Sequence, residues 1–121
     1  MMSKGTFRDL VVWQKAIELS KELYHATQMM PDTEKFGLTA QMRRAAVSVA
    51  SNIAEGNARQ KIADYIHFLV IARGSLAELE TQLIIATDLK MLSNTEGLMD
   101  NVQEVRRMLQ ALIDSLRRKQ A

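Results

Sequence analysis

The sequence contains no cysteine, a single proline and only five glycines among its 121 residues. Without cysteine the chain can form neither a disulfide nor a thiolate metal site, which fits a reducing compartment. The scarcity of proline and glycine, together with plentiful alanine, leucine and methionine, favours helix throughout the chain.

Long apolar runs and a strong net charge are also missing. Apolar stretches such as residues 69–72 are too short to span a bilayer, and the opening MMSKGTFRD lacks the apolar core of a signal peptide. We therefore expect a cytoplasmic protein without a membrane segment. Because the net charge is only +2, contact with nucleic acid would depend on local clusters of bases. The length predicts one domain, residues 1–121, with a substantial core.

Hydrophobic periodicity predicts four helices, at about residues 9–29, 38–56, 61–92 and 95–119. Pro31 follows the first helix as a stop signal, and Gly56 is expected to cap the second because glycine tolerates a positive φ. The fourth helix repeats its apolar residues in alternating steps of three and four, as in a bundle seam. Since the connections are short and nothing indicates a strand, we predict an all-α fold, an antiparallel up-down-up-down four-helix bundle.

The second helix is unusual because small residues dominate its sequence, QMRRAAVSVASNIAEG. It carries two apolar stripes on roughly opposite sides: Leu38, Met42, Ala45, Val49 and Ile53 on one, and Ala40, Val47, Ala50 and Ala54 on the other. Ile71 and Ile85 likewise lie away from the main apolar stripe of the third helix. Surplus apolar positions of this kind indicate a subunit interface, so we expect a homo-oligomer. The alternative is that they are scattered surface residues without a function.

Two short motifs raise the question of a metal site. Glu22 and His25, and then Asp64 and His67, are spaced i and i+3, as in di-iron bundles. Metal ligands must point into a bundle, whereas these residues lie on charged or outer faces of their helices. The sequence also contains no serine elbow and no phosphate-binding glycine loop. We therefore expect no catalytic residue, no metal site and no cofactor, and a metalloenzyme is the least favoured hypothesis.

Charged and polar residues placed near the apolar stripes form a second candidate set. Arg43 falls among the alanines of the second helix, and a partly buried arginine favours a bidentate carboxylate partner. We predict a structural polar network that fixes helix register or subunit packing; its members are Arg43, Asn52, Glu55, Arg73, Glu78 and Glu80. The alternative interpretation of this set is a pocket that binds an anion.

The third candidate set is basic. Arg106, Gln110 and Arg117 share one face of the fourth helix with no acid of that helix between them. Further bases follow at the end of that helix and at the turn after Gly56, and together the candidate phosphate contacts are Arg59, Lys61, Arg106, Arg117, Arg118 and Lys119. No aromatic residue lies between these bases, so stacking on nucleic-acid bases has no support. The alternative is an ordinary solvated face.

Three segments of the chain resemble a known bacterial family: FRDLVVWQKAIEL, FGLTAQMRRAAVSVASNIAEGNAR and FLVIARGSLAELETQLIIA. They are similar to the 23S rRNA intervening sequence proteins, sometimes called S23, over residues 7–116. The resemblance implies a homopentamer of four-helix bundles with no catalytic activity. It also implies kinship with the accessory variability proteins of diversity-generating retroelements, which are basic pentamers that bind nucleic acid and a reverse transcriptase.

These observations favour a non-enzymatic, oligomeric helical-bundle protein that binds RNA or DNA through bases on its outer surface. The family name describes reading frames found inside 23S rRNA insertions and does not itself identify an RNA ligand. The alternative hypothesis is a protein-interaction scaffold with no nucleic-acid role, in keeping with the small net charge.

Overall fold

The structure is a computed structural model and describes residues 5–120. Four long helices make up most of it: α1 (Val11–Ala26), α2 (Leu38–Asn57), α3 (Ile62–Asp88) and α4 (Glu96–Gln120). Short 3-10 helices precede and follow α1, namely η1 (Phe7–Asp9), η2 (Thr27–Met29) and η3 (Asp32–Glu34). Residues 5–120 contain no strand, which confirms the predicted all-α class.

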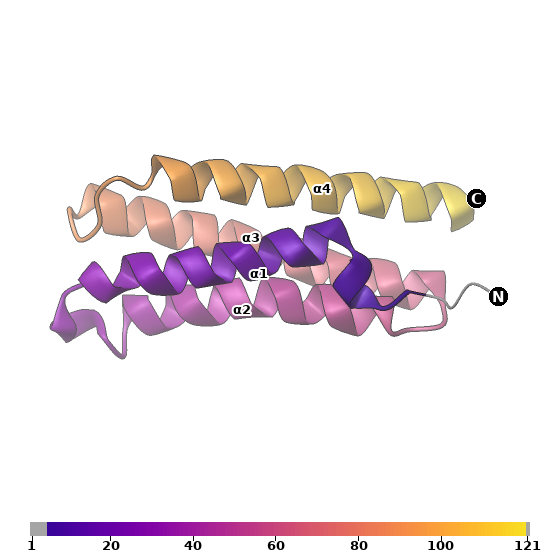
Figure 1. The fold of residues 1–121 in the computed structure, drawn as a ribbon, viewed down its shortest axis with the longest axis horizontal. Helices are drawn as coiled ribbons and strands as arrows, with labels where there is room; N and C mark the ends of the chain where they lie inside the picture. Colours follow the sequence, from indigo (N-terminus) through magenta and orange to yellow (C-terminus); the bar gives the residue numbers. More distant parts are fainter. Residues whose placement is uncertain (1–4, 121) are drawn as a thin grey trace.

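The helices form an antiparallel up-and-down bundle, as predicted (Figure 1). α1 packs against α2 and α4, and α3 packs against the same two helices from the other side. The start of α1, the α2–α3 turn and the carboxyl end of α4 lie at one end of the bundle (Figure 1). We call this the α2–α3 end. The opposite end carries the α1–α2 and α3–α4 connections, and we call it the α3–α4 end.

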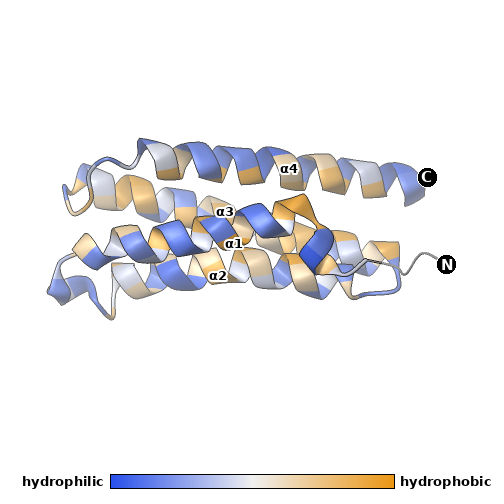
Figure 2. Cartoon of the chain, viewed as in Figure 1, coloured by the Kyte–Doolittle hydropathy of each residue, from blue (hydrophilic) through white to orange (hydrophobic). Residues whose placement is uncertain are grey.

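One apolar core runs between the four helices and receives residues from each of them. Its fully buried large side chains include Leu19 and Leu23 of α1, Met42 and Ile53 of α2, Leu69, Leu79 and Leu83 of α3, and Leu109 and Ile113 of α4. α4 shows the separation most clearly: its hydrophobic residues line the side toward the other helices, while its outer side is hydrophilic (Figure 2). The helix faces that hydrophobic periodicity predicted to be buried therefore form the core of the bundle.

α3 ends at Asp88, before the predicted boundary at residue 92. Lys90 has a φ of 61°, in the left-handed region, and the backbone N–H groups of Met91 and Leu92 both donate to the carbonyl of Ala86. The chain therefore turns back sharply after the helix. Leu92 is nonetheless buried, because the turn folds its side chain onto the core. Leu92 is an apolar residue of the turn that lies at helical spacing, and for this reason the sequence pattern placed the end of the helix too late.

The predicted cap at Gly56 is wrong. Gly56 lies inside α2, and no glycine of residues 5–120 has a positive φ. A Cβ at this position would lie 2.9 Å from the Cβ of Phe68 and 3.1 Å from the carbonyl oxygen of Tyr65. Glycine is therefore required for the close approach of α3 to the end of α2, and its conformational freedom plays no part.

The two stripes of α2 are not equally exposed. Ala50, assigned to the outer stripe, is only 6% exposed and belongs to the core. Val47 of the same stripe is 43% exposed, and Ala40 and Ala54 are half-buried. The outer apolar surface of α2 is therefore narrower than the sequence pattern indicated, because α1 covers part of it.

Candidate functional site

The residues of the two metal-like motifs lie on the surface. The carboxylate of Glu22 accepts two hydrogen bonds from the amide nitrogen of Asn101, at 2.7 and 2.8 Å, which link α1 to α4. His25, Asp64 and His67 are exposed. Within residues 5–120, no group of three or more histidine, aspartate and glutamate side chains is arranged to hold a metal ion.

Arg43 has a different partner from the one that the sequence predicted. Its Nε donates to the Oγ1 of Thr27 at 2.9 Å, and its Nη2 donates to the carbonyl of Tyr24 at 3.3 Å. Its guanidinium also lies 4.6 Å from the centre of the Tyr24 ring, a cation–π contact. No carboxylate of residues 5–120 forms an ion pair with it. Arg43 therefore joins α2 to the end of α1.

The other members of the predicted polar network form separate contacts. Asn52 donates to the Ser48 carbonyl at 2.8 Å, and the Ser48 hydroxyl is 2.9 Å from that of Ser75 on α3. The remaining members act elsewhere: Glu55 pairs with Arg59 at 2.9 Å, Arg73 donates to Gln110 at 2.8 Å, and Glu80 accepts from Gln103 and Arg106. Glu78 is exposed and has no ion pair among residues 5–120. The structure thus divides the set into local pairs and does not bring it together.

The basic face predicted on α4 is partly neutralised by its neighbours. Arg106 pairs with Glu80 of α3 at 2.8 Å. Gln110 accepts a hydrogen bond from Arg73 and donates one to Asp114 at 3.0 Å. The expectation that no acid of this helix lies between these residues is therefore wrong, because Asp114 is one turn after Gln110 and contacts it. Glu80 could not be found from periodicity within α4, because it comes from a different helix.

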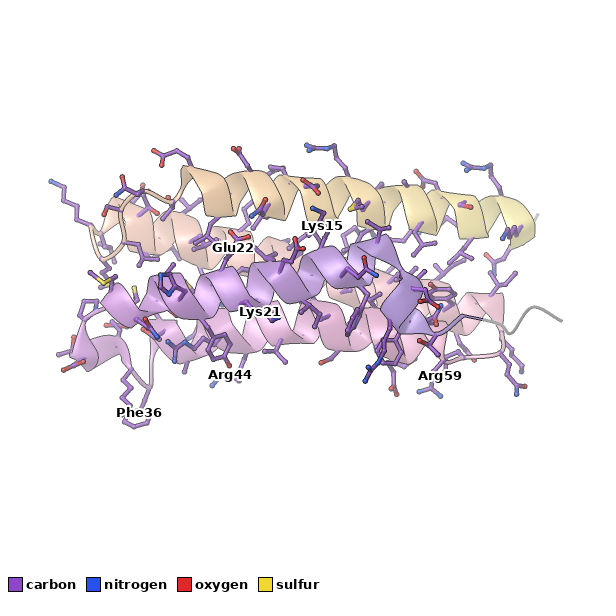
Figure 3. The ribbon with its side chains drawn as sticks, in the orientation of Figure 1. Lys15, Lys21, Glu22, Phe36, Arg44 and Arg59 are labelled. Carbon is purple, nitrogen blue, oxygen red and sulfur yellow. The ribbon has the colours of Figure 1, made fainter. Side chains whose placement is uncertain are left out.

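The remaining bases gather at the α2–α3 end. Lys61 precedes α3, and Arg117, Arg118 and Lys119 occupy the last turn of α4. These four side chains are exposed and form no ion pair within residues 5–120. Arg59 lies at the same end (Figure 3), although it is held by Glu55 and stacks 4.7 Å from the Phe68 ring centre. We call Lys61, Arg117, Arg118 and Lys119 the basic end residues.

A groove between α1 and α2 was not found from the sequence. It consists of three adjoining hollows of about 630, 640 and 260 Å³. Tyr24 and Arg43 line the first two, Ile17 and Ser20 line the first and third, and Val47 lines the second and third. We call this surface the α1–α2 groove. The sequence contains Tyr24, Lys21 and Arg43, which line the groove. They come together only because of how α1 and α2 are oriented about their own axes, which the sequence pattern does not give.

The groove combines apolar and cationic side chains. Its floor contains Trp13, Ile17, Val47, Ala50 and Ala54, and its basic residues are Lys21, His25, Lys35, Arg43 and Arg44. No aspartate or glutamate lines any of the three hollows. Figure 3 shows Arg44 reaching outward from α2 and Phe36, which is 88% exposed, projecting from the α1–α2 connection. The groove therefore favours an acidic, apolar occupant.

Comparison with known proteins identifies the family. The sequence profile of the 23S rRNA-intervening sequence protein family matches residues 8–111. The chain belongs to this family. The resemblance to the intervening sequence proteins is thereby confirmed over residues 8–111. Comparison with curated proteins gives no match.

A solved structure has the same fold as this chain. It is the 1.70 Å crystal structure of a protein of unknown function from the S23 ribosomal protein family of Bacteroides thetaiotaomicron. The match has a TM-score of 0.79 and covers 85% of this chain and 98% of the other, at 24% sequence identity. At that identity the likeness concerns the fold.

No helix among residues 5–120 is both long and apolar enough to cross a membrane.

Proposed function

We propose that this chain is a non-enzymatic, cytoplasmic, homo-oligomeric protein that binds RNA or DNA through the basic end residues. The supporting observation is that Lys61, just before α3, and Arg117, Arg118 and Lys119, in the last turn of α4, belong to elements that share one end of the bundle (Figure 1). Phosphates bind cations and release counterions, so nucleic acid is the natural ligand of such a cluster.

Available charge distinguishes this end from the rest of the basic surface. Arg106 and Arg59 already face carboxylates at 2.8 and 2.9 Å, so a phosphate would have to compete with Glu80 or Glu55. The basic end residues have no such competitor within residues 5–120. We therefore assign the principal phosphate contacts to them, and only secondary contacts to Arg59 and Arg106.

Assembly would strengthen this binding. Copies related by rotation about an axis parallel to the helices place the same end of every bundle on the same side. A homopentamer, the assembly implied by the family resemblance, would then present the basic end residues of all copies on one rim. Several weak contacts to one nucleic acid would act together through their high effective concentration.

The test compares two double variants with equal changes in charge. Lys61→Glu with Arg118→Glu reverses charge at the α2–α3 end, whereas Lys90→Glu with Arg107→Glu reverses two exposed bases elsewhere. Fluorescence anisotropy with an RNA hairpin, single-stranded RNA and duplex DNA should show at least ten-fold weaker binding for the first variant and little change for the second. Wild-type affinity should fall steeply with salt. The proposal fails if the wild type binds none of the probes at low salt, or if both variants weaken binding equally.

The alternative function, a protein-interaction scaffold, is favoured by the α1–α2 groove. Its apolar floor and cationic rim are suited to a protein surface of opposite charge. Absence of nucleic-acid binding in the anisotropy experiment would make this function the better one.

A further inference from the structure

The outward face of α3 carries apolar and acidic residues that the bundle does not use. Ile71 and Ile85 are 38% and 43% exposed, and Glu78 lies between them at seven-residue spacing on the same face. Asp88 continues the row toward the α3–α4 end. Seven residues are two helical turns, so these side chains form one stripe. We call Ile71, Gly74, Glu78, Ile85 and Asp88 the α3 stripe.

Gly74 leaves the backbone of α3 uncovered within this stripe. A glycine inside a helix is less favourable than alanine. Such a cost is usually explained by a neighbour that leaves no room for a Cβ, as at Gly56. At Gly74, however, an added Cβ would meet nothing within 4 Å among the described residues. The packing of the subunit therefore does not require glycine here, and the missing side chain would let a second helix approach the stripe closely.

The α1–α2 groove is complementary to this stripe in charge and in polarity. Lys21, Lys35 and Arg44 line it, are exposed and form no ion pair within residues 5–120. From Ile71 to Asp88 the stripe contains two acids and no lysine or arginine, and the hollows of the groove are lined by bases and no acid. His67 lies on the same face, one turn before Ile71. Its floor is mainly aliphatic, with Ile17, Val47 and two alanines beside Trp13, and it suits isoleucine side chains. The Tyr24 ring, moreover, already carries the Arg43 guanidinium on one face.

The two surfaces also match in their level along the bundle. The hydrogen bond between Ser48 and Ser75 places these residues side by side on antiparallel helices. Arg44 lies one turn before Ser48, and Glu78 lies about one turn after Ser75, so both are at the same level. They form no ion pair within the subunit. Asp88 lies at the α3–α4 end, where the α1–α2 connection that carries Lys35 also lies. Rotation about an axis parallel to the helices preserves these levels between copies.

We propose that the α3 stripe of one copy docks in the α1–α2 groove of the next copy. This inference rests on the homo-oligomer of the proposed function and names the surfaces that meet. Glu78 pairs with Arg44, Ile71 covers the apolar floor, and Gly74 permits a close helix approach. Ile85 lies nearer the hollow that Phe36 and Ala40 line. Because different surfaces of each copy are used, the contact is heterologous and closes into a ring when the rotation allows it.

A charge-swap experiment tests the pairing. Arg44→Glu and Glu78→Arg each place like charges at the contact, so each variant alone should shift the mass measured by light scattering at a fixed concentration toward the monomer. The double variant carrying both changes restores opposite charges and should recover the wild-type mass. An equimolar mixture of the two single variants should recover the mass only in part, because alternation of the two variants around a ring of five copies leaves one contact between like charges. Circular dichroism should show unchanged helix content.

The control exchanges exposed charges of α4, Arg107→Glu and Asp100→Arg, and should leave the mass unchanged. The docking is overturned if the wild type is monomeric, if the single variants keep the wild-type mass, or if the double variant does not recover it and the mixture does not recover it in part. It is also overturned if Arg44→Glu abolishes RNA binding without changing the mass, since the groove would then hold nucleic acid. Because Lys61 and Arg118 are intact in all these variants, failure of the docking is distinguishable from failure of nucleic-acid binding at the α2–α3 end.

Discussion

α3 and α4 are the two longest helices, and they use their sequences differently. The large apolar side chains of α4 are buried or half-buried, and its outer face is polar (Figure 2). α3 contributes as much to the core, yet Ile71, Ile84 and Ile85 remain exposed on it, and Gly74 faces open space. The needs of one subunit explain the pattern of α4 completely and that of α3 only on its inner side. Excess apolar character on a helix that already has a buried face indicates a second contact.

The largest effects should come from the inner faces, where the two helices are equivalent. Leu79 of α3 and Leu109 of α4 are both 0% exposed. Leu79→Ala and Leu109→Ala should each lower the free energy of unfolding by about 2–5 kcal/mol, because a core cavity adds to the lost transfer energy. Denaturant titration at low protein concentration measures both. A much smaller loss for one of them would show that the two helices do not share the core equally.

Glycine substitutions should separate the outer faces. Gly74 in α3 and Gly97 in α4 both have open space where a Cβ would lie. Gly97→Ala should stabilise the protein by at most about 0.5 kcal/mol at any concentration, because alanine is the better helix former but Gly97 lies in the first turn of α4. Gly74→Ala should bring a similar gain in the dilute subunit but weaken the oligomer. Thermal unfolding over a hundred-fold range of protein concentration measures both effects. If Gly74→Ala leaves the oligomer unchanged, the outer face of α3 does not form the second contact.

The contact between the outer edges of α3 and α4 should contribute less. Glu80 and Arg106 pair at 2.8 Å, with side chains 24% and 44% exposed. Surface pairs of this kind are typically worth about 0.2–1 kcal/mol, so Glu80→Gln should cost an amount at the lower part of that range. The same change frees Arg106 and should strengthen RNA binding slightly at low salt. Weaker RNA binding in Glu80→Gln would contradict the assignment of Arg106 as a partly neutralised base.

The smallest effect concerns the packing of α4 on α1. A hydrogen bond with Glu104 is the main cause that raises the pKa of Lys15 above its ordinary value of 10.5, and Glu18 contributes as well. A raised lysine pKa stabilises the folded state at pH values below 10.5, and this contribution is lost as pH rises through the folded pKa. Unfolding curves between pH 9 and pH 12 should therefore show a slightly smaller loss of stability for Lys15→Met than for the wild type. Lys21→Met serves as the control and should follow the wild type.

The fold could be predicted from the sequence because the spacing of the apolar residues in each helix indicates which face is buried. α4 illustrates this, since Val102, Val105 and Leu109 are all buried as their spacing indicates. Predictions failed where a residue had more than one physical use. Gly56 suggested a turn but serves close packing, and Leu92 suggested more helix but is an apolar residue of a turn.

The candidate site was less predictable, because it depends on which helices become neighbours. Nothing within the sequence of α4 reveals that Glu80 lies beside Arg106, and nothing within α2 reveals that Arg43 reaches the backbone of α1. The position of Lys61 and Arg118 at the same end of the bundle follows from the antiparallel topology and could have been inferred from it. The α1–α2 groove required the rotation of each helix about its own axis, which periodicity gives only approximately.

The contacts of Arg43 have a consequence for local unfolding. The last carbonyls of a helix lack partners within it, and Arg43 supplies one to Tyr24 from a different helix. Its second hydrogen bond holds Thr27, whose hydroxyl donates to the carbonyl of Leu23. The last turn of α1 can therefore fray only if Arg43 releases it, which ties it to the first half of α2. Amide protons of these two segments should exchange with solvent as a single cooperative unit, and Arg43→Met should divide that unit into two.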